Sequence, residues 1–219
     1  MLMLFGGSFD PVHIGHRKVA TAAQQQLGAD QVVWLPNYRS PLKSVSHTSA
    51  EQRQHMLELM LAHCQQASWQ LDLHELLSSV PCYTIDSLRR WRQQLGPNQP
   101  LVFLIGQDSL QQLSQWRDWQ QLTDFAHLAV VSRTSATGAC TDEIKNWLKN
   151  RLTDSPQLIQ SRPFGNVIML NTPFWDISST ELRSALADQR PLDDWLDPPI
   201  RDYILKLGLY RHLESNASS

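Results

Sequence analysis

Residues 6–16 of this chain read Gly6-Gly7-Ser8-Phe9-Asp10-Pro11-Val12-His13-Ile14-Gly15-His16. The apolar run before them, residues 1–5, predicts a buried strand, and apolar residues recur at helical spacing after Ile14. A pair of glycines therefore ends a strand, and a turn leads into a helix. Glycine lets the backbone approach a ligand closely because it has no Cβ, and the N–H groups of a helix N-terminus suit an anion such as phosphate.

The histidines of this stretch, His13 and His16, are three residues apart, so at the start of a helix they project from the same face. A lone histidine is more often structural than catalytic. A pair that brackets Gly15 at a strand-to-helix junction favours a phosphate site, because open α/β sheets bind their ligands at such junctions. The common alternatives G-x-x-x-x-G-K-[ST], G-x-G-x-x-G and H-E-x-x-H do not occur in the sequence.

These residues carry a resemblance to a known family. The segment His13-Ile14-Gly15-His16 resembles the (H/T)-x-G-H signature of the nucleotidyltransferases, and Ile177-Ser178-Ser179-Thr180-Glu181-Leu182-Arg183 resembles their I-S-S-T-x-[IVL]-R signature. The two motifs stand in the family's order, near opposite ends of the chain. The chain is most similar to the bacterial nicotinate-nucleotide adenylyltransferases, and the similarity covers most of its length.

The resemblance implies a nucleotidyl transfer. The 5′-phosphate of nicotinate mononucleotide would attack the α-phosphate of ATP, giving deamido-NAD and pyrophosphate, with Mg²⁺ bound mainly through phosphates and water. A phosphate monoester is already a nucleophile, so the protein must supply positioning and charge stabilisation rather than a covalent intermediate. The implied catalytic residues are His13, His16 and Arg183. The implied ATP-binding residues are Gly6, Gly7, Ser8, Phe9, Gly15, Ser178, Ser179 and Thr180.

The second motif also has a structural interpretation. Ser178 and Glu181 have the S-x-x-E spacing of a capping box, so a helix is predicted to start here whatever the function. Capping does not account for Ser179, Thr180 and Arg183 near the same N-terminus. Hydroxyls, N–H groups and an arginine at one helix start would hold a polyphosphate.

The family resemblance also predicts a mononucleotide site. Its residues would be Lys43, Tyr83, Thr84, Gly106, Asp108, Trp116 and Arg133. Several have ordinary alternatives, since Asp108 is a favoured helix cap, the Tyr83-Thr84 pair could simply start a helix, and most tryptophans pack in the core. The sequence also departs from the family at Leu42, where histidine is usual.

Three alternative functions stay open: two other kinds of nucleotidyltransferase and a nucleotide sensor without activity. Phosphopantetheine adenylyltransferases and the cytidylyltransferases of small phosphoalcohols share the signature, although the first usually have Thr at the position of His13. A nucleotide-sensing module that lost turnover would keep the fold, but it would have no need of the two histidines.

Composition excludes several classes of function. The chain has 219 residues and a formal net charge of −2, which indicates neither a nucleic acid nor an acidic membrane as partner. Cys64, Cys82 and Cys140 are odd in number and lack C-x-x-C spacing, so they indicate reduced thiols in a cytoplasmic protein rather than disulfides or a zinc site. No apolar run approaches membrane-spanning length.

Short apolar strands alternate with amphipathic helices along the chain, which predicts a three-layer α/β fold with a mostly parallel central sheet. The resemblance makes this fold Rossmann-like, with both motifs at the carboxyl edge of the sheet. We expect a single nucleotidyltransferase domain over residues 1–213, a disordered tail over 214–219, and a monomer or small homo-oligomer. Residues 154–165 are expected to form an irregular connection.

Overall fold

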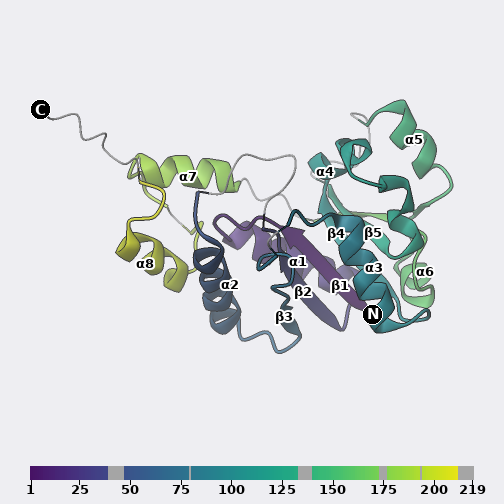
Figure 1. Ribbon diagram of the computed structural model, residues 1–219, viewed down its shortest axis with the longest axis horizontal. Helices are drawn as coiled ribbons and strands as arrows, with labels where there is room; N and C mark the ends of the chain where they lie inside the picture. The colour runs from purple at the N-terminus through teal and green to yellow at the C-terminus, as the bar shows by residue number, and fades with distance from the viewer. Residues whose placement is uncertain (39–46, 79, 133–139, 173–176, 193, 212–219) are drawn as a thin grey trace, which may run out of the picture.

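The computed structural model describes residues 1–38, 47–78, 80–132, 140–172, 177–192 and 194–211. Within these ranges a sheet of 7 strands is covered by helices on both faces (Figure 1). Each pair of neighbouring strands runs parallel. The prediction of a three-layer α/β fold is therefore confirmed. The predicted tail, residues 214–219, lies outside the described residues.

The order of the strands creates a crevice at the centre of the sheet. In space the order is β3-β2-β1-β4-β5-β7-β6. The strands are β1 (Leu2–Gly7), β2 (Gln31–Pro36), β3 (Trp69–Leu71), β4 (Leu101–Gly106), β5 (His127–Ser132), β6 (Leu152–Thr153) and β7 (Val167–Asn171). The chain winds from β1 out to β3 and then returns to place β4 on the other side of β1. The loops after β1 and β4 therefore leave in opposite directions, which is the position where such sheets bind ligands.

The helices fill the connections between these strands. They are α1 (Ile14–Leu27), α2 (Ala50–Cys64), α3 (Thr84–Leu95), α4 (Gln107–Gln111), α5 (Asp142–Leu148), α6 (Pro156–Ser161), α7 (Ser179–Ala187) and α8 (Pro198–Leu207), with 3₁₀ helices η1 (Leu113–Gln115) and η2 (Trp119–Asp124). Figure 1 shows α2, α7 and α8 gathered at one end of the molecule. None of the helices in the described ranges has both the length and the apolar character needed to cross a membrane.

The expectation of an irregular connection over residues 154–165 is wrong. The helix α6 lies within it, and the short strand β6 ends directly before it. Ser155 caps α6 by accepting a hydrogen bond from the N–H of Leu158 at 3.2 Å, and Ile159 is fully buried. A helix with a single buried side chain shows no apolar period in the sequence, so periodicity could not reveal it.

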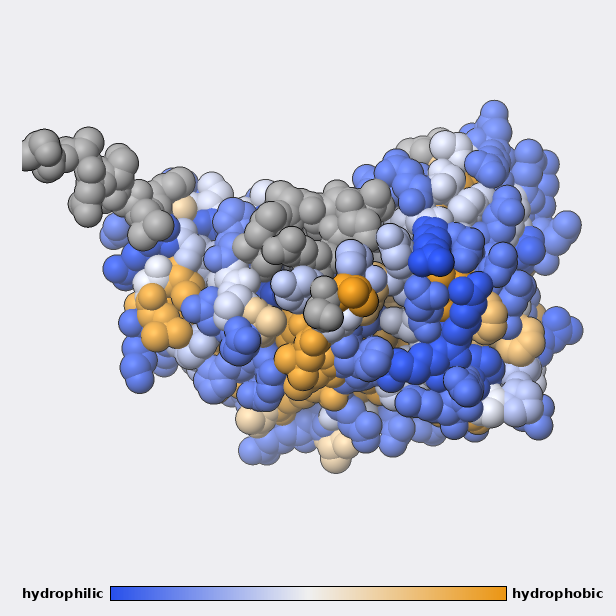
Figure 2. Space-filling view, viewed as in Figure 1, coloured by the Kyte–Doolittle hydropathy of each residue, from blue (hydrophilic) through white to orange (hydrophobic). Residues whose placement is uncertain are grey.

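The core lies on both faces of the sheet because side chains alternate along each strand. Met3 and Phe5 of β1 pack on the face that also receives α1, α2, α7 and α8. Leu2 and Leu4 pack on the opposite face, against α3, α4 and α5. The outer side of α3 is strongly hydrophilic (Figure 2). Burial on both faces explains why the strands read as continuous apolar runs in the sequence.

A buried carboxylate ties the end of the chain to the loop after β1. Asp10 is 4% exposed, and one of its oxygens accepts hydrogen bonds from the hydroxyls of Thr48 and Tyr210, both at 2.7 Å. Its other oxygen accepts from the backbone N–H of His47 at 2.9 Å. Burial, and next the negative charge of Asp10, raise the pKa of Tyr210 well above its ordinary value. The phenol therefore stays a hydrogen-bond donor.

Replacing Tyr210 with Phe should lower the free energy of unfolding by about 1–3 kcal/mol, because a buried carboxylate loses a donor. Urea unfolding of the two proteins measures this change. Tyr203→Phe is the control, since the ring of Tyr203 contacts that of His55 in a tilted arrangement at a centroid distance of 4.6 Å. A control change of less than about 0.5 kcal/mol is expected. Equal stability of Tyr210→Phe and the wild type would contradict a role of this hydroxyl.

Candidate functional site

The loop after β1 presents two histidine rings at the start of α1. His13 is the N-cap residue, and its Nδ1 accepts from the backbone N–H of His16 at 3.4 Å. The Nδ1 of His16 accepts in return from the backbone N–H of His13 at 3.3 Å. The ring centroids lie 3.7 Å apart. Because each Nδ1 accepts, a neutral ring carries its hydrogen on Nε2, so both rings are donors at that nitrogen.

Gly15 lies against the ring of His13, where a side chain has no room. A Cβ at this position would lie 2.9 Å from Nδ1 of His13 and 3.6 Å from Cβ of Ile177. The first of these distances is too short for any other residue without movement of the imidazole. The glycine therefore lets the imidazole of His13 lie directly against the start of α1.

The second motif starts α7 beside the same loop. Ser178 is the N-cap residue and accepts from the N–H of Glu181 at 3.2 Å, so the predicted cap forms. The hydroxyl of Ser179 donates to the carbonyl oxygen of Pro11 at 3.2 Å. Arg183 donates to the carbonyl oxygen of Asp10 at 2.7 Å, across 173 positions of the sequence. These contacts hold the start of α7 against the loop that carries the histidines.

Side-chain hydroxyls of this motif have partners of their own. Ser178 donates to the carboxylate of Glu181 at 2.7 Å, and Thr180 accepts from Arg183 at 3.2 Å. Thr180 is exposed and Arg183 is half-buried. The motif thus presents hydroxyl groups and a guanidinium at one helix N-terminus, where first-turn N–H groups also point outward.

Burial sets the charge of His13. The residue is 4% exposed, and burial lowers its pKa to about 4. At neutral pH this ring is therefore an uncharged hydrogen-bond donor rather than a cation.

The shift of His13 predicts a pH dependence of stability. Its pKa is 6.5 in an unfolded chain and about 4 in the folded one. As the pH falls from 6.5 toward 4, the unfolded chain gains a proton that the folded chain excludes, so stability is lost over this window. The full loss is roughly 3 kcal/mol, and it is complete below the folded pKa.

Urea unfolding from about pH 7 to about pH 4 tests this effect in the wild type and in His13→Asn. Asn keeps an acceptor at the cap but does not titrate. The wild type should lose more stability than the variant over that window. Parallel curves for the two proteins would contradict a buried, uncharged His13.

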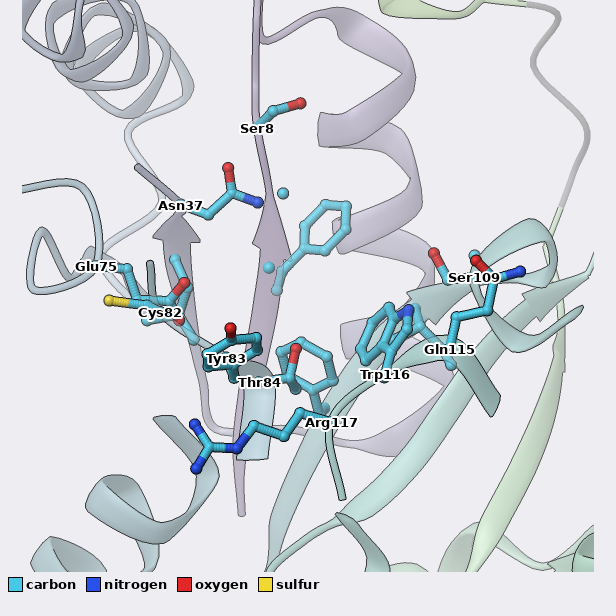
Figure 3. Close-up of a pocket in the computed structure, with 17 residues that line it drawn as sticks. Ser8, Asn37, Glu75, Cys82, Tyr83, Thr84, Ser109, Gln115, Trp116 and Arg117 are labelled. Atoms are coloured by element: carbon cyan, nitrogen blue, oxygen red, sulfur yellow. The ribbon is translucent and has the colours of Figure 1, made fainter. Parts of the chain in front are cut away.

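A pocket lies next to this cluster, at the crevice between β1 and β4. Figure 3 shows Tyr83 and Thr84 on one side of it and Trp116 and Gln115 on the other. Trp116 contacts Phe103 edge to face, with ring centroids 6.5 Å apart. Seven residues predicted for the two substrates line this pocket: Gly6, Gly7, Ser8, Tyr83, Thr84, Gly106 and Trp116.

Other predicted residues lie elsewhere. Asp108 is exposed in the first turn of α4 and is not among the residues that line the pocket. Phe9 is buried, and its ring packs edge-on against His16 at a centroid distance of 5.1 Å. Lys43 and Arg133, together with the departure at Leu42, lie outside the described residues.

Other residues that line the pocket were not predicted from the sequence, among them Asn37, Glu75 and Arg117. Asn37 follows β2 directly, so its position at the end of a strand could have marked it as a pocket residue. Glu75 accepts from the hydroxyl of Ser87 at 2.6 Å, and burial raises its pKa. The guanidinium of Arg117 lies 4.9 Å from the ring centre of Tyr83. No local pattern in the sequence marks the positions of Glu75 and Arg117.

Comparison with known proteins gives close relatives over nearly the whole chain. The family model described as cytidylyltransferase-like matches residues 4–185. A protein of Yersinia pestis (strain Pestoides F) named as a nicotinate-nucleotide adenylyltransferase is 39% identical over 209 residues, which cover 95% of this chain and 94% of that protein. One of Escherichia coli O157:H7 with the same name is 37% identical over 209 residues, with 95% and 97% covered.

Solved structures share the fold. The Plasmodium falciparum nicotinic acid mononucleotide adenylyltransferase complexed with NaAD matches with a TM-score of 0.72 at 22% identity, over 95% of this chain and 96% of that one. The same enzyme complexed with APC gives a TM-score of 0.69 at 21% identity, with the same coverage, 95% and 96%. At these identities the match concerns the arrangement of helices and strands.

Proposed function

The chain belongs to the cytidylyltransferase-like family, and from this premise we propose that it is a nicotinate-nucleotide adenylyltransferase of NAD biosynthesis. It transfers AMP from ATP to nicotinate mononucleotide, producing deamido-NAD and pyrophosphate. The observation that carries the proposal is the meeting of the two motifs. The histidine pair and the start of α7 lie against one loop, which also lines a pocket with aromatic walls.

The reaction is an in-line displacement at the α-phosphorus of ATP. An oxygen of the mononucleotide phosphate forms the new P–O bond, and the bond to the bridging oxygen of pyrophosphate breaks. Charge grows on the leaving oxygen and on the oxygens of the α-phosphate. The Nε2–H donors of His13 and His16 stabilise that charge, and their fixed tautomers require no reorganisation during the reaction.

The start of α7 holds the departing pyrophosphate. Arg183 adds a positive charge beside the first-turn N–H groups, and an anion is most stable at that end of a helix. The hydroxyls near it can rotate from their present partners to phosphate oxygens. The proposed ATP-binding residues are Gly6, Gly7, Ser8, Phe9, Gly15, Ser178, Ser179 and Thr180.

The pocket receives the pyridine ring of the mononucleotide. Trp116 and Tyr83 supply flat apolar walls, which suit stacking of a ring. Tyr83 is the N-cap residue of α3 and makes no side-chain capping bond, so first-turn N–H groups of α3 are suited to the nicotinate carboxylate. The proposed mononucleotide site comprises Lys43, Tyr83, Thr84, Gly106, Asp108, Trp116 and Arg133.

We propose that Mg²⁺ enters with ATP as part of the substrate. Among the described residues there is no group of three or more His, Cys, Asp or Glu side chains arranged to hold a metal ion. The nearby carboxylate of Asp10 already accepts from Thr48, Tyr210 and the backbone of His47. Because this carboxylate is already hydrogen-bonded, the cation would be bound through phosphate oxygens and water, which is a common arrangement for Mg²⁺. When bound, Mg²⁺ would neutralise part of the negative charge of the phosphates.

Pyrophosphate release in the presence of ATP and Mg²⁺ tests the function. Nicotinate mononucleotide, nicotinamide mononucleotide and phosphopantetheine are compared at equal concentration, each with ATP and with CTP. We expect fast release with ATP and nicotinate mononucleotide. Release with phosphopantetheine instead would contradict the proposed substrate. A preference for CTP would contradict ATP as the proposed nucleotide. ATP binding without release from any substrate would favour a sensing module.

A further inference from the structure

A buried arginine joins the two loops that follow β1 and β2. Arg53 of α2 is 1% exposed. Its Nη1 donates to the carbonyl oxygens of Ser8 at 2.9 Å and Asn37 at 2.6 Å, and its Nη2 donates to that of Tyr38 at 3.0 Å. Burial lowers the pKa of Arg53, and the negative charge of Asp10 acts against that shift. The guanidinium is thus a buried cation whose partners are backbone oxygens of two loops.

The hydrogen bonds of Arg53 begin at the point where the pairing of β1 with β2 ends. Strands β1 and β2 pair through the register Gly7 to Pro36, and the N–H of Asn37 still donates to the carbonyl oxygen of Gly7 at 3.0 Å. Beyond this point the carbonyl oxygens of Ser8 and Asn37 converge on one nitrogen of Arg53. Two converging carbonyl groups repel each other unless a donor lies between them, and a charged donor binds both strongly.

The same bonds orient the peptide that follows Ser8. In a trans peptide the N–H points opposite to the C=O. Because the carbonyl of Ser8 is directed at Arg53 in α2, the N–H of Phe9 is directed away from α2. Phe9 has a φ of 48°, a left-handed conformation that is rare for a bulky side chain. Such a conformation persists only where its surroundings hold it.

We infer that Arg53 is a positioning residue for the nucleotidyl transfer: by binding the carbonyl groups of Ser8, Asn37 and Tyr38 it fixes the loop proposed for ATP relative to the wall of the mononucleotide pocket. The inference rests on the proposed function for its substrates. Ser8 and Asn37 both line the pocket, and they directly follow β1 and β2 respectively (Figure 3). Arg53 acts through these loops and is assigned no contact with substrate.

Arg53→Lys is the informative variant. Lys keeps the positive charge, but its single ammonium cannot donate in the planar fork that reaches three carbonyl groups. Misplacement of reacting groups by about an ångström lowers rates up to ~100-fold, so we expect kcat/KM for both substrates to fall at least ~10-fold. The dissociation constant for ATP, measured by calorimetry, should rise by a similar factor.

The matched control is Arg92→Lys. Arg92 is partly buried and, like Arg53, has backbone partners: it donates to the carbonyl oxygens of Phe125, Gly96, Gln99 and Pro163 at 2.7–2.9 Å. It does not line the pocket. The control should lose thermal stability as Arg53→Lys does, while its kcat/KM stays within about two-fold of the wild type.

Adding methylguanidinium to Arg53→Ala should restore part of the lost kcat/KM, and adding methylammonium should not.

Each result bears on a different statement. Wild-type turnover together with unchanged kcat/KM in Arg53→Lys would overturn the inference and leave the proposed function intact. Equal losses of kcat/KM in both Lys variants would also overturn it, since that is what a purely structural role predicts. A wild type without turnover would contradict the proposed function, and the ATP dissociation constants of the two variants would still decide the role of Arg53.

Discussion

Replacing His16 with Asn lowers turnover of nicotinate mononucleotide at least ~100-fold, because the site loses a charge-stabilising donor. The oxygen of Asn can take the place of Nδ1 and accept from the N–H of His13, a bond that measures 3.3 Å in the wild type. The cap of α1 is then kept, but nothing replaces the Nε2–H. Steady-state rates of pyrophosphate release at saturating ATP measure the effect.

Two further variants show whether the donor itself matters. In His16→Gln the side-chain amide can reach the position of Nε2, so turnover should recover by about ten-fold over His16→Asn. His55→Ala removes a half-exposed histidine from α2 and should leave turnover unchanged. Turnover of His16→Asn within a few-fold of the wild type would remove His16 from the role of charge stabiliser.

Replacing Arg183 with Ala should raise the KM for ATP and lower turnover, with kcat/KM for ATP falling about 10- to 100-fold. The change removes the positive charge from the start of α7. It also removes the bond of 2.7 Å to the carbonyl oxygen of Asp10, which holds α7 against the histidine loop. The KM for nicotinate mononucleotide should change less, because Arg183 does not line its pocket.

The control for Arg183 lies at the end of the same helix. Arg190 is about half exposed and pairs with Asp188 at 3.3 Å, away from the first turn of α7. Arg190→Ala should keep the KM for ATP. An unchanged dependence on ATP in Arg183→Ala would show that the start of α7 does not hold the phosphates. Arg183→Lys separates charge from geometry, since it keeps the charge and loses the two-pronged contact.

The architecture was predictable because its signals are local. Each main strand is a continuous apolar run, and the helix start at Ser178 carries a side-chain cap that the sequence shows directly. The start of α1 near Ile14 followed from the apolar residues at helical spacing after it. Helix α6 escaped prediction because only Ile159 among its residues is buried.

The candidate site was predictable in part. The histidine pair was found from its spacing and the second motif from the family resemblance, and Gly6 and Gly106 lie at the ends of β1 and β4 as expected. Arg53 could not be found this way, because its three bonds join it to segments 15 to 45 positions away. Periodicity predicts which face of a helix is buried, but it does not predict which backbone oxygens a buried cation will meet.

The bond between Tyr210 and Asp10 has a consequence for synthesis of the chain. The two residues are 200 positions apart, so during translation Asp10 emerges long before its partner. At ordinary rates of elongation the interval is roughly 10–40 s. Throughout that time the loop after β1 lacks the phenol that caps its carboxylate, and for most of it the loop also lacks Arg183, which is 173 positions from Asp10. The loop after β1 therefore gains its full set of bonds only once α7 and the segment that follows α8 have been made.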